Sequence, residues 1–220
     1  ANLLTYTKAF DTVRRLLAQT ELARVRGYTP STFSFNVEGG RCESCKGEGA
    51  EKVEMQFLSD VYVPCPECHG KRFRAEVLEV TYKGKGLTDI LNFTVTEALE
   101  FFGEQKELKR RLSPLAAVGL EYMRLGQSLT TLSGGEAQRL KLAPHIGRER
   151  PIDAARGKDE GTLFIFDEPT TGLHFADIQK LLNAFDQLIV RGHSVLIIEH
   201  NLEVVKYADH LIDLGPEGGD

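Results

Sequence analysis

Four cysteines in two pairs are the residues of this chain best suited to bind a metal ion. Cys42 pairs with Cys45 and Cys65 with Cys68, with two residues inside each pair and 19 between the pairs. Two such pairs supply four thiolates for a tetrahedral zinc ion. Because zinc has no redox chemistry and four thiolates leave no open position, the spacing predicts a structural site. Sites of this kind contribute about 10–16 kcal/mol in isolated zinc-finger peptides.

Two disulfides or a redox-active pair are the alternative interpretations of these cysteines. A redox motif needs no second pair at this spacing. The N-terminus does not read as a signal peptide, so we expect a cytoplasmic chain that begins inside a longer protein. His69 adjoins the second pair, but four thiolates already satisfy the metal. Gly47, Gly49 and Gly70 permit tight turns that aim amide hydrogens at the sulfurs.

Two acidic residues and a histidine near the C-terminus form a second candidate group. Asp167 and Glu168 follow the apolar run 162–166, which is typical of a buried strand. Ligands of α/β sheets bind at the C-terminal ends of parallel strands, where Asp167 could hold Mg²⁺ and Glu168 could polarise an attacking water. A second apolar run, 194–198, precedes His200, so parallel pairing would bring His200 near Glu168. Taken alone, an Asp-Glu pair is more often an exposed acidic loop.

A serine and two glycines precede a stretch with helical character. Ser133, Gly134 and Gly135 are expected to open a helix that contains Gln138 and Arg139. Free amides at a helix start, with no bulky side chains in the way, bind phosphate well. A flexible linker is the alternative for Ser-Gly-Gly in isolation. The residues that follow it, and the acidic pair and histidine further along, favour a nucleotide site.

Composition sets limits on the class of protein. The chain has 220 residues, 41% of them hydrophobic, and no apolar run long enough to span a membrane. Its net charge is −5, so electrostatics gives no general argument for nucleic acid, and any DNA contact needs a local patch. Lys71, Arg72 and Arg74, just after the second cysteine pair, are candidates for phosphate contacts. A solvated basic strand face is the alternative.

The apolar pattern predicts the elements that position these residues. Helices are expected over residues 7–26 with a stop at Gly27, after Thr96 as N-cap, and after Ser133, where Pro144 should end the helix early. Short strands are expected around the cysteines, at Phe33, Phe35 and Val37, at Val53, Met55 and Phe57, and at 61–63. The C-terminal region predicts strand 162–166, a helix through 178–189 closed by Gly192, strand 194–198, a short helix at 202–205 and a third strand at 210–214, in a parallel sheet.

Several motifs resemble those of known ATPases. LSGGE at 132–136 resembles the signature motif of ATP-binding-cassette ATPases, LFIFDEP at 163–169 their Walker B strand, and His200 their switch histidine. Closer similarity is to the second nucleotide-binding half of the UvrA family, which senses DNA damage in bacterial nucleotide excision repair. The motifs are TLSGGEAQR at 131–139, DEPTTGLH at 167–174, IEHNL at 198–202 and DLGPEGG at 213–219. FSFN at 33–36 and DVYVPC at 60–65 resemble the zinc module of that family.

This resemblance implies an α/β fold with three parts. A partial ATP-binding-cassette core, with a mostly parallel sheet and helices, would carry an inserted zinc-binding β-rich module and a helical signature subdomain. The implied organisation is a helical segment of the signature subdomain at 1–31, the zinc module at 32–86, the helical signature subdomain at 87–147, a polar loop at 148–161, and the Walker B and switch-histidine core at 162–220.

The resemblance also implies roles for individual residues. Asp167 would assist Mg²⁺, Glu168 would be the general base and His200 would sense the γ-phosphate. The signature residues that would close over ATP bound to another half of the molecule are Ser133, Gly134, Gly135 and Gln138. The zinc ligands, which would position a hairpin used in recognising damaged DNA, are Cys42, Cys45, Cys65 and Cys68.

The implied partners complete the expectation. They are damaged duplex DNA, an upstream half of the same protein that carries the Walker A loop, a second copy in a homodimer, and a UvrB-like repair protein, with no membrane. No G-x-x-x-x-G-K-[S/T] loop occurs in this chain. We therefore expect the chain alone not to hydrolyse ATP, because it would hold half of each composite site.

Three alternatives stay open from the residues. The first is a UvrA-like paralogue linked to drug resistance. The second is a chaperone zinc module of the DnaJ type. The segment from Cys42 to Gly49 matches the cysteine knuckle of that module, but this interpretation leaves Ser133 and His200 without a role. The third is a soluble ATP-binding-cassette protein without a DNA role, such as a ribosome-acting resistance factor, against which the cysteine module argues.

Overall fold

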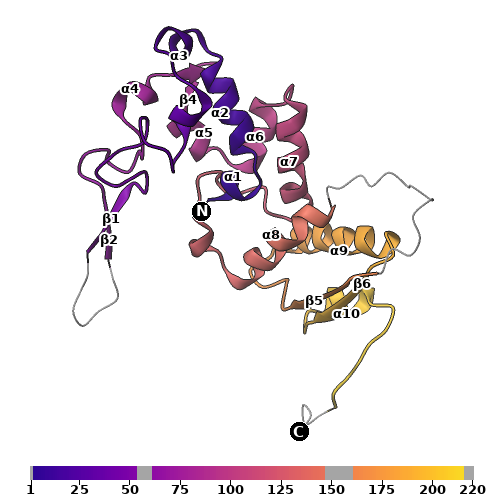
Figure 1. The fold of residues 1–220 in the computed structure, drawn as a ribbon. Helices are drawn as coiled ribbons and strands as arrows, with labels where there is room; N and C mark the ends of the chain where they lie inside the picture. The colour runs from indigo at the N-terminus through magenta and orange to yellow at the C-terminus, as the bar shows by residue number, and fades with distance from the viewer. Residues whose placement is uncertain (1, 54–60, 147–160, 216–220) are drawn as a thin grey trace. The chain divides into compact units, whose positions relative to one another are not determined.

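A computed structural model describes residues 2–53, 61–146 and 161–215. The chain divides into two compact units, each drawn with its labelled elements in Figure 1. Unit 1 comprises Ala1–Leu108 and Arg124–Gln127, and unit 2 comprises Lys109–Met123 and Ser128–Asp220. No described helix is long and apolar enough to cross a membrane.

Unit 1 consists of short helices and two small hairpins. Its helices are α1 (Leu3–Tyr6), α2 (Phe10–Ala18), α3 (Glu21–Val25), the 3₁₀ helix η1 (Pro30–Phe33), α4 (Ala75–Leu78), α5 (Leu87–Asn92) and α6 (Val95–Phe101). Its strands form the antiparallel pairs β1 (Ala50–Val53) with β2 (Val61–Pro64) and β3 (Thr81–Tyr82) with β4 (Lys85–Gly86). The helix α7 (Lys106–Ala117) begins in unit 1 and continues in unit 2.

Unit 2 is an α/β arrangement around two parallel strands. Its elements after α7 are η2 (Leu129–Thr131), α8 (Gly134–Ile146), β5 (Leu163–Asp167), α9 (Phe175–Val190), β6 (Ser194–Ile198) and α10 (Leu202–Tyr207). The strands β5 and β6 pair in parallel from Leu163 with Ser194 to Asp167 with Ile198. This confirms the parallel pairing and the intervening helix expected from the apolar runs, with β5 shifted by one residue.

The single helix expected over residues 7–26 is wrong, because the chain breaks near Thr20. The hydroxyl of Thr20 donates to the carbonyl of Leu17 at 2.8 Å, and Thr20 itself is extended, with ψ of 155°. A side chain that bonds its own backbone in this way competes with the helix. The expected stop is confirmed, since Gly27 has φ of +68° just after α3.

The strand expected at Phe33, Phe35 and Val37 is also wrong. Phe33 ends η1, which Pro30 begins, because proline fixes φ and suits a first helical position. Phe35 instead joins an aromatic cluster, with its ring 4.8 Å from that of Phe10 and 5.2 Å from that of Phe73. The strands at Val53 and at 61–63 are confirmed in β1 and β2, whereas Met55 and Phe57 lie outside the described residues.

The N-cap of α6 is Thr94, not Thr96. Thr94 Oγ1 accepts from the Glu97 N–H at 3.1 Å, and Glu97 Oε2 accepts from the Thr94 N–H at 2.7 Å. This reciprocal capping box satisfies two amides at the helix start, which a cap two residues later would leave open.

Two expectations in unit 2 also need correction. Pro144 lies inside α8 and does not end it, since the helix continues to Ile146, where the Arg191 guanidinium donates to the carbonyls of His145 and Ile146. The third strand expected at 210–214 is absent: the structure gives these residues no strand and leaves Leu211 exposed. The expected polar loop lies outside the described residues except for Gly161, as does the end of the motif at 213–219.

Candidate metal centre and nucleotide-contacting residues

The four cysteines converge in unit 1 on one buried cluster. Their sulfurs all lie within 4.8 Å of one another, with 3.9 Å between those of Cys42 and Cys65 and 3.6 Å between those of Cys45 and Cys68. A zinc ion about 2.3 Å from each sulfur at the centre of a tetrahedron requires edges of about 3.8 Å. The donor set therefore fits zinc, and the separations far exceed a disulfide bond of about 2.05 Å.

Backbone amides point at the sulfurs, as the glycines predicted. The N–H of Gly49 donates to Cys45 Sγ at 3.2 Å, and the N–H of Arg72 donates to Cys68 Sγ at 3.3 Å. Gly47 and Gly49 have φ of +85° and +77°, and a Cβ on Gly47 would lie 2.5 Å from the Phe35 carbonyl oxygen. These amides stabilise thiolates, the form of cysteine that binds a metal.

The two cysteine pairs are held together by a short antiparallel ladder. The N–H of Cys42 donates to the Arg72 carbonyl at 2.9 Å, and the N–H of Arg74 donates to the Gly40 carbonyl at 3.0 Å. A further bond runs from the Cys65 N–H to the Gly49 carbonyl at 3.0 Å. Backbone bonds between segments far apart in sequence thus bring the two cysteine pairs together.

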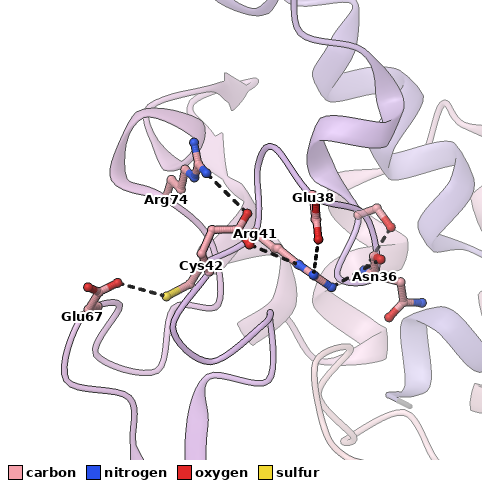
Figure 2. A network of polar contacts seen from close by, with 8 residues as sticks. Asn36, Glu38, Arg41, Cys42, Glu67 and Arg74 are labelled. Atoms are coloured by element: carbon pink, nitrogen blue, oxygen red, sulfur yellow. Dashed lines mark hydrogen bonds and ion pairs between the residues drawn. The ribbon is translucent and has the colours of Figure 1, made fainter.

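Charged side chains lie near Cys42 (Figure 2). Arg41 lies within 3.5 Å of Glu38 and 4.0 Å of Glu43, and its guanidinium donates to the Asn36 carbonyl at 3.4 Å. The Glu67 carboxylate lies 3.9 Å from Cys42 Sγ. These contacts tie the loop at 36–38 to the first cysteine pair.

The surroundings of three of the thiols shift their pKa values in different directions. Hydrogen bonding from the Cys68 backbone N–H lowers the pKa of Cys65 to about 7, whereas burial raises the pKa of Cys68 to about 12 and also raises that of Cys42. Four thiolates cannot share this volume without a cation to offset their charge. A bound metal ion would supply that charge and displace the thiol protons.

Two of the three basic residues proposed to contact DNA, Arg72 and Arg74, already contact other side chains. The Arg72 guanidinium lies 5.6 Å from the centre of the Phe35 ring, and Arg74 pairs with Glu43 at 3.4 Å, while Lys71 is exposed. A cleft of about 470 Å³ beside the cysteines carries Arg74 and three glutamates, Glu43, Glu67 and Glu76. The acidic lining disfavours a phosphate inside the cleft. Of the three basic candidates, the exposed Lys71 therefore stays available for a phosphate contact.

In unit 2, the serine and glycines lie at the start of α8 as expected. Glu136 Oε2 accepts from the Ser133 N–H at 2.8 Å, and Ser133 Oγ accepts from the Glu136 N–H at 3.3 Å. Burial alone would raise the pKa of Glu136, but hydrogen bonds from Tyr122 and Ser133 hold it below its ordinary value. Ser133 and Gly134 are exposed, and a Cβ on Gly134 would meet nothing within 4 Å. The start of α8 is therefore open to solvent at Ser133 and Gly134.

Gln138 and Arg139 tether α8 to the end of β5. The Gln138 amide donates to the Asp167 carbonyl at 2.8 Å and accepts from the Asp167 N–H at 3.3 Å. The buried Arg139 donates to the Pro169 carbonyl at 2.9 Å, and Gly135 packs against the same loop. Gln138 and Gly135 therefore fix the helix to the strand, whereas Ser133 and Gly134 face outward.

Asp167, Glu168 and His200 lie at the same end of the parallel pair. Asp167 is opposite Ile198, the Glu168 N–H donates to the Ile198 carbonyl at 2.9 Å, and His200 follows two residues later. Glu168 has φ of 45°, a left-handed conformation that is uncommon outside glycine and typical of functional sites. All three side chains are exposed. The structure thus brings the acidic pair and the histidine together at the C-terminal ends of β5 and β6.

Sequence reasoning missed Glu199, whose carboxylate binds backbone groups of the loop after β5 and of the loop after β6. Its carboxylate accepts from the Thr170 N–H at 2.9 Å, from the Thr170 hydroxyl, from the His200 N–H at 3.0 Å and from the Asn201 N–H at 3.2 Å. Burial alone would raise the pKa of Glu199, but the Thr170 bonds hold it below its ordinary value. The one available signal was an acidic residue directly after the strand, which His200 overshadowed.

Known proteins include relatives of this chain. No family model matches the chain. It is 56% identical over 220 residues to UvrABC system protein A from Halalkalibacterium halodurans and 54% identical to that from Methanothermobacter thermautotrophicus, and covers 22% of each. The crystal structure of UvrA2 from Deinococcus radiodurans matches with a TM-score of 0.83 at 51% identity, over 95% of this chain and 25% of that one. The chain therefore belongs to the UvrA family and spans about a fifth of the length of its curated relatives.

Proposed function

We propose that this chain is the part of a nucleotide excision repair ATPase that contributes half of each composite ATP site together with a zinc module. The observation that carries the proposal is the convergence of the Ser133 corner, Asp167, Glu168 and His200 within one unit whose relatives are UvrABC system A proteins. Asp167 would act on Mg²⁺, Glu168 as general base and His200 on the γ-phosphate.

In the proposed arrangement the exposed signature residues serve a different ATP molecule from the one that Glu168 acts on. Ser133 and Gly134 would close over ATP held by another half of the protein or by a second copy. Gln138 and Gly135 would contribute by holding α8 on β5, as their contacts indicate.

An upstream Walker A-bearing half is the proposed partner of the sheet. The face of β5 and β6 away from α9 carries Leu163, Ile165, Leu196 and Ile198, which are 42–61% exposed. Parallel sheets are normally covered on both faces. The residues that the longer relatives have in addition would supply that cover and the phosphate-binding loop.

The zinc module would present the β1–β2 hairpin to damaged duplex DNA, with Lys71 as a phosphate contact. Four free, buried thiols at tetrahedral spacing support Zn²⁺ as its structural ion. In this proposal the protein works in the cytoplasm with a UvrB-like partner and as a homodimer.

Nucleotide hydrolysis tests the proposal directly. The complete gene product should hydrolyse ATP in the presence of Mg²⁺, Glu168→Gln should abolish turnover, and the 220-residue chain alone should be inactive. Chelation of zinc should remove any preference for lesion-bearing over intact duplex. Turnover by the isolated chain that Glu168→Gln removes, or lesion preference that survives complete zinc loss, would overturn the corresponding part.

A further inference from the structure

We propose that Glu199 is a positioning residue that holds His200 in register with the loop after β5. The inference rests on the proposed function, because it assigns Glu199 a part in the use of ATP at that site. It goes beyond the proposed function because Glu199, although part of the IEHNL motif at 198–202, has no role there.

The geometry of the carboxylate carries the inference. One oxygen accepts from the N–H and the hydroxyl of Thr170, and the other accepts from the N–H groups of His200 and Asn201. The two oxygens therefore each hold a different loop, one after β5 and one after β6. Thr170 is only 8% exposed, so this bridge is shielded from competing water on one side.

The bridge extends to the signature helix through neighbouring bonds. Pro169, next to Thr170, accepts from Arg139 of α8 at 2.9 Å. Asn201, next to His200, caps α10 by accepting from the Glu203 N–H at 3.0 Å. A displacement of α8 would thus be felt at His200 through Pro169, Thr170 and Glu199, all within unit 2.

A carboxylate is the group that this position requires. Its four partners are all donors, three N–H groups and one hydroxyl, and an ionised carboxylate accepts at both oxygens without presenting a donor of its own. An amide of the same size would turn its NH₂ toward one pair of donors. The Glu199→Gln variant should therefore free one loop while keeping the size and packing of the side chain.

The test compares Glu199→Gln with Glu203→Gln in the complete gene product. Glu203 lies on α10 in the same unit, and its carboxylate pairs with Lys206 at 3.0 Å, so the variant controls for the loss of one charge while leaving the backbone bond from Glu203 to Asn201 in place. For Glu199→Gln we expect kcat for ATP to fall by about tenfold or more, as for a lost hydrogen bond to a charged group, with KM changed less than about twofold. Glu203→Gln should match the wild type.

A second variant keeps the test decisive if Glu199→Gln lowers the melting temperature. Thr170→Val removes only the hydroxyl bond to Glu199 and retains the buried volume and the N–H bond. It should lower kcat by about threefold or more at an unchanged KM. If Glu168→Gln abolishes turnover while Glu199→Gln and Thr170→Val both keep the wild-type kcat, the positioning role is wrong. If the wild-type protein has no turnover, or Glu168→Gln leaves it intact, the proposed function itself fails.

Discussion

Two glycines of unit 1, Gly47 beside the first cysteine pair and Gly84 in the turn between β3 and β4, show how single residues decide whether the metal centre can form. Gly47 and Gly84 both have left-handed φ, at +85° and +76°, so alanine at either position carries conformational strain. Only at Gly47 would the new Cβ also meet backbone, 2.5 Å from the Phe35 carbonyl oxygen, whereas at Gly84 it meets nothing within 4 Å. Comparing alanine at the two positions therefore separates the effect of backbone strain from the effect of a steric clash.

We predict that Gly47→Ala weakens zinc binding and Gly84→Ala does not. Gly84→Ala should destabilise the chain by about 1 kcal/mol, the usual effect of a left-handed alanine. Gly47→Ala should destabilise it by more than about 2 kcal/mol, because the clash displaces the turn that carries the Gly49 amide. Competition with a chromophoric chelator and urea unfolding measure the two effects. Equal losses in both variants would contradict the steric argument.

Acid should weaken unit 2 partly through Glu199. Because its pKa is lowered on folding, its contribution to stability is fully present above the pKa of an unfolded glutamate, about 4.3, and is lost as pH falls through the lower folded value. The free energy of unfolding should therefore drop less steeply between about pH 5 and pH 3 in Glu199→Gln than in the wild type. Urea titrations across this range measure the slopes, and identical slopes would refute the assignment.

At the residue scale the sequence predicted the cysteines well and the bridging carboxylate poorly. Cysteine spacing is informative because the metal imposes a fixed geometry on a local motif. Glu199 has its partners on two loops that follow different strands, so its role depends on the register of β5 and β6. No local pattern encodes that register.

At the scale of elements, long apolar periodic stretches were the predictable ones. The helix α9 and the strand β6 follow from uninterrupted apolar patterns, and burial of one face reinforces the pattern in α9. The expected helix over residues 7–26 was broken by one hydroxyl at Thr20, and the expected strand at 33–37 gave way to aromatic stacking around Phe35. Local side-chain bonds and tertiary contacts decided both cases, and the sequence pattern contains neither.

The tether between α8 and β5 gives a prediction at this scale. Gln138→Ala removes both bonds to the Asp167 backbone and should destabilise unit 2 by about 1–3 kcal/mol, since each bond contributes about 0.5–1.5 kcal/mol. Gln179→Ala on α9 removes one exposed side-chain bond to Asn183 and should change stability by less than about 0.5 kcal/mol. Unfolding by urea and hydrogen exchange at the Asp167 amide measure the difference. Unchanged exchange at Asp167 would show that the tether is dispensable.

At the scale of the whole molecule, the sequence predicted the class of fold but not the two units. Unit 1 includes residues 124–127, which return to it after α7 has entered unit 2. The Leu125 carbonyl accepts from the Leu4 N–H at 2.9 Å, and the Leu125 N–H donates to the Phe93 carbonyl at 2.9 Å. Such a return depends on pairing between distant segments. The boundaries expected from the family resemblance stay predictions.

The exposed apolar face of the sheet offers a prediction that separates the isolated chain from the complete protein. Ile165 and Leu196 point away from α9 and are 61% and 42% exposed. The double substitution Ile165→Thr and Leu196→Thr places a β-branched residue suited to a strand at each position, so in the isolated chain it should change stability by less than about 1 kcal/mol.

In the complete gene product the same substitution should destabilise the protein much more. There the proposed upstream half would cover this face, and the interface would lose two buried apolar side chains. Each such side chain contributes about 1.5–3 kcal/mol when fully buried, so we expect a loss of several kcal/mol and weaker ATP binding. Val190→Thr at the end of α9, where the side chain is 87% exposed, is the matched control and should be neutral in both proteins. Urea unfolding and nucleotide titration of the two proteins provide the comparison. Equal effects in the isolated chain and the complete protein would mean that nothing covers this face, and the composite arrangement of the ATP sites would then lack its scaffold.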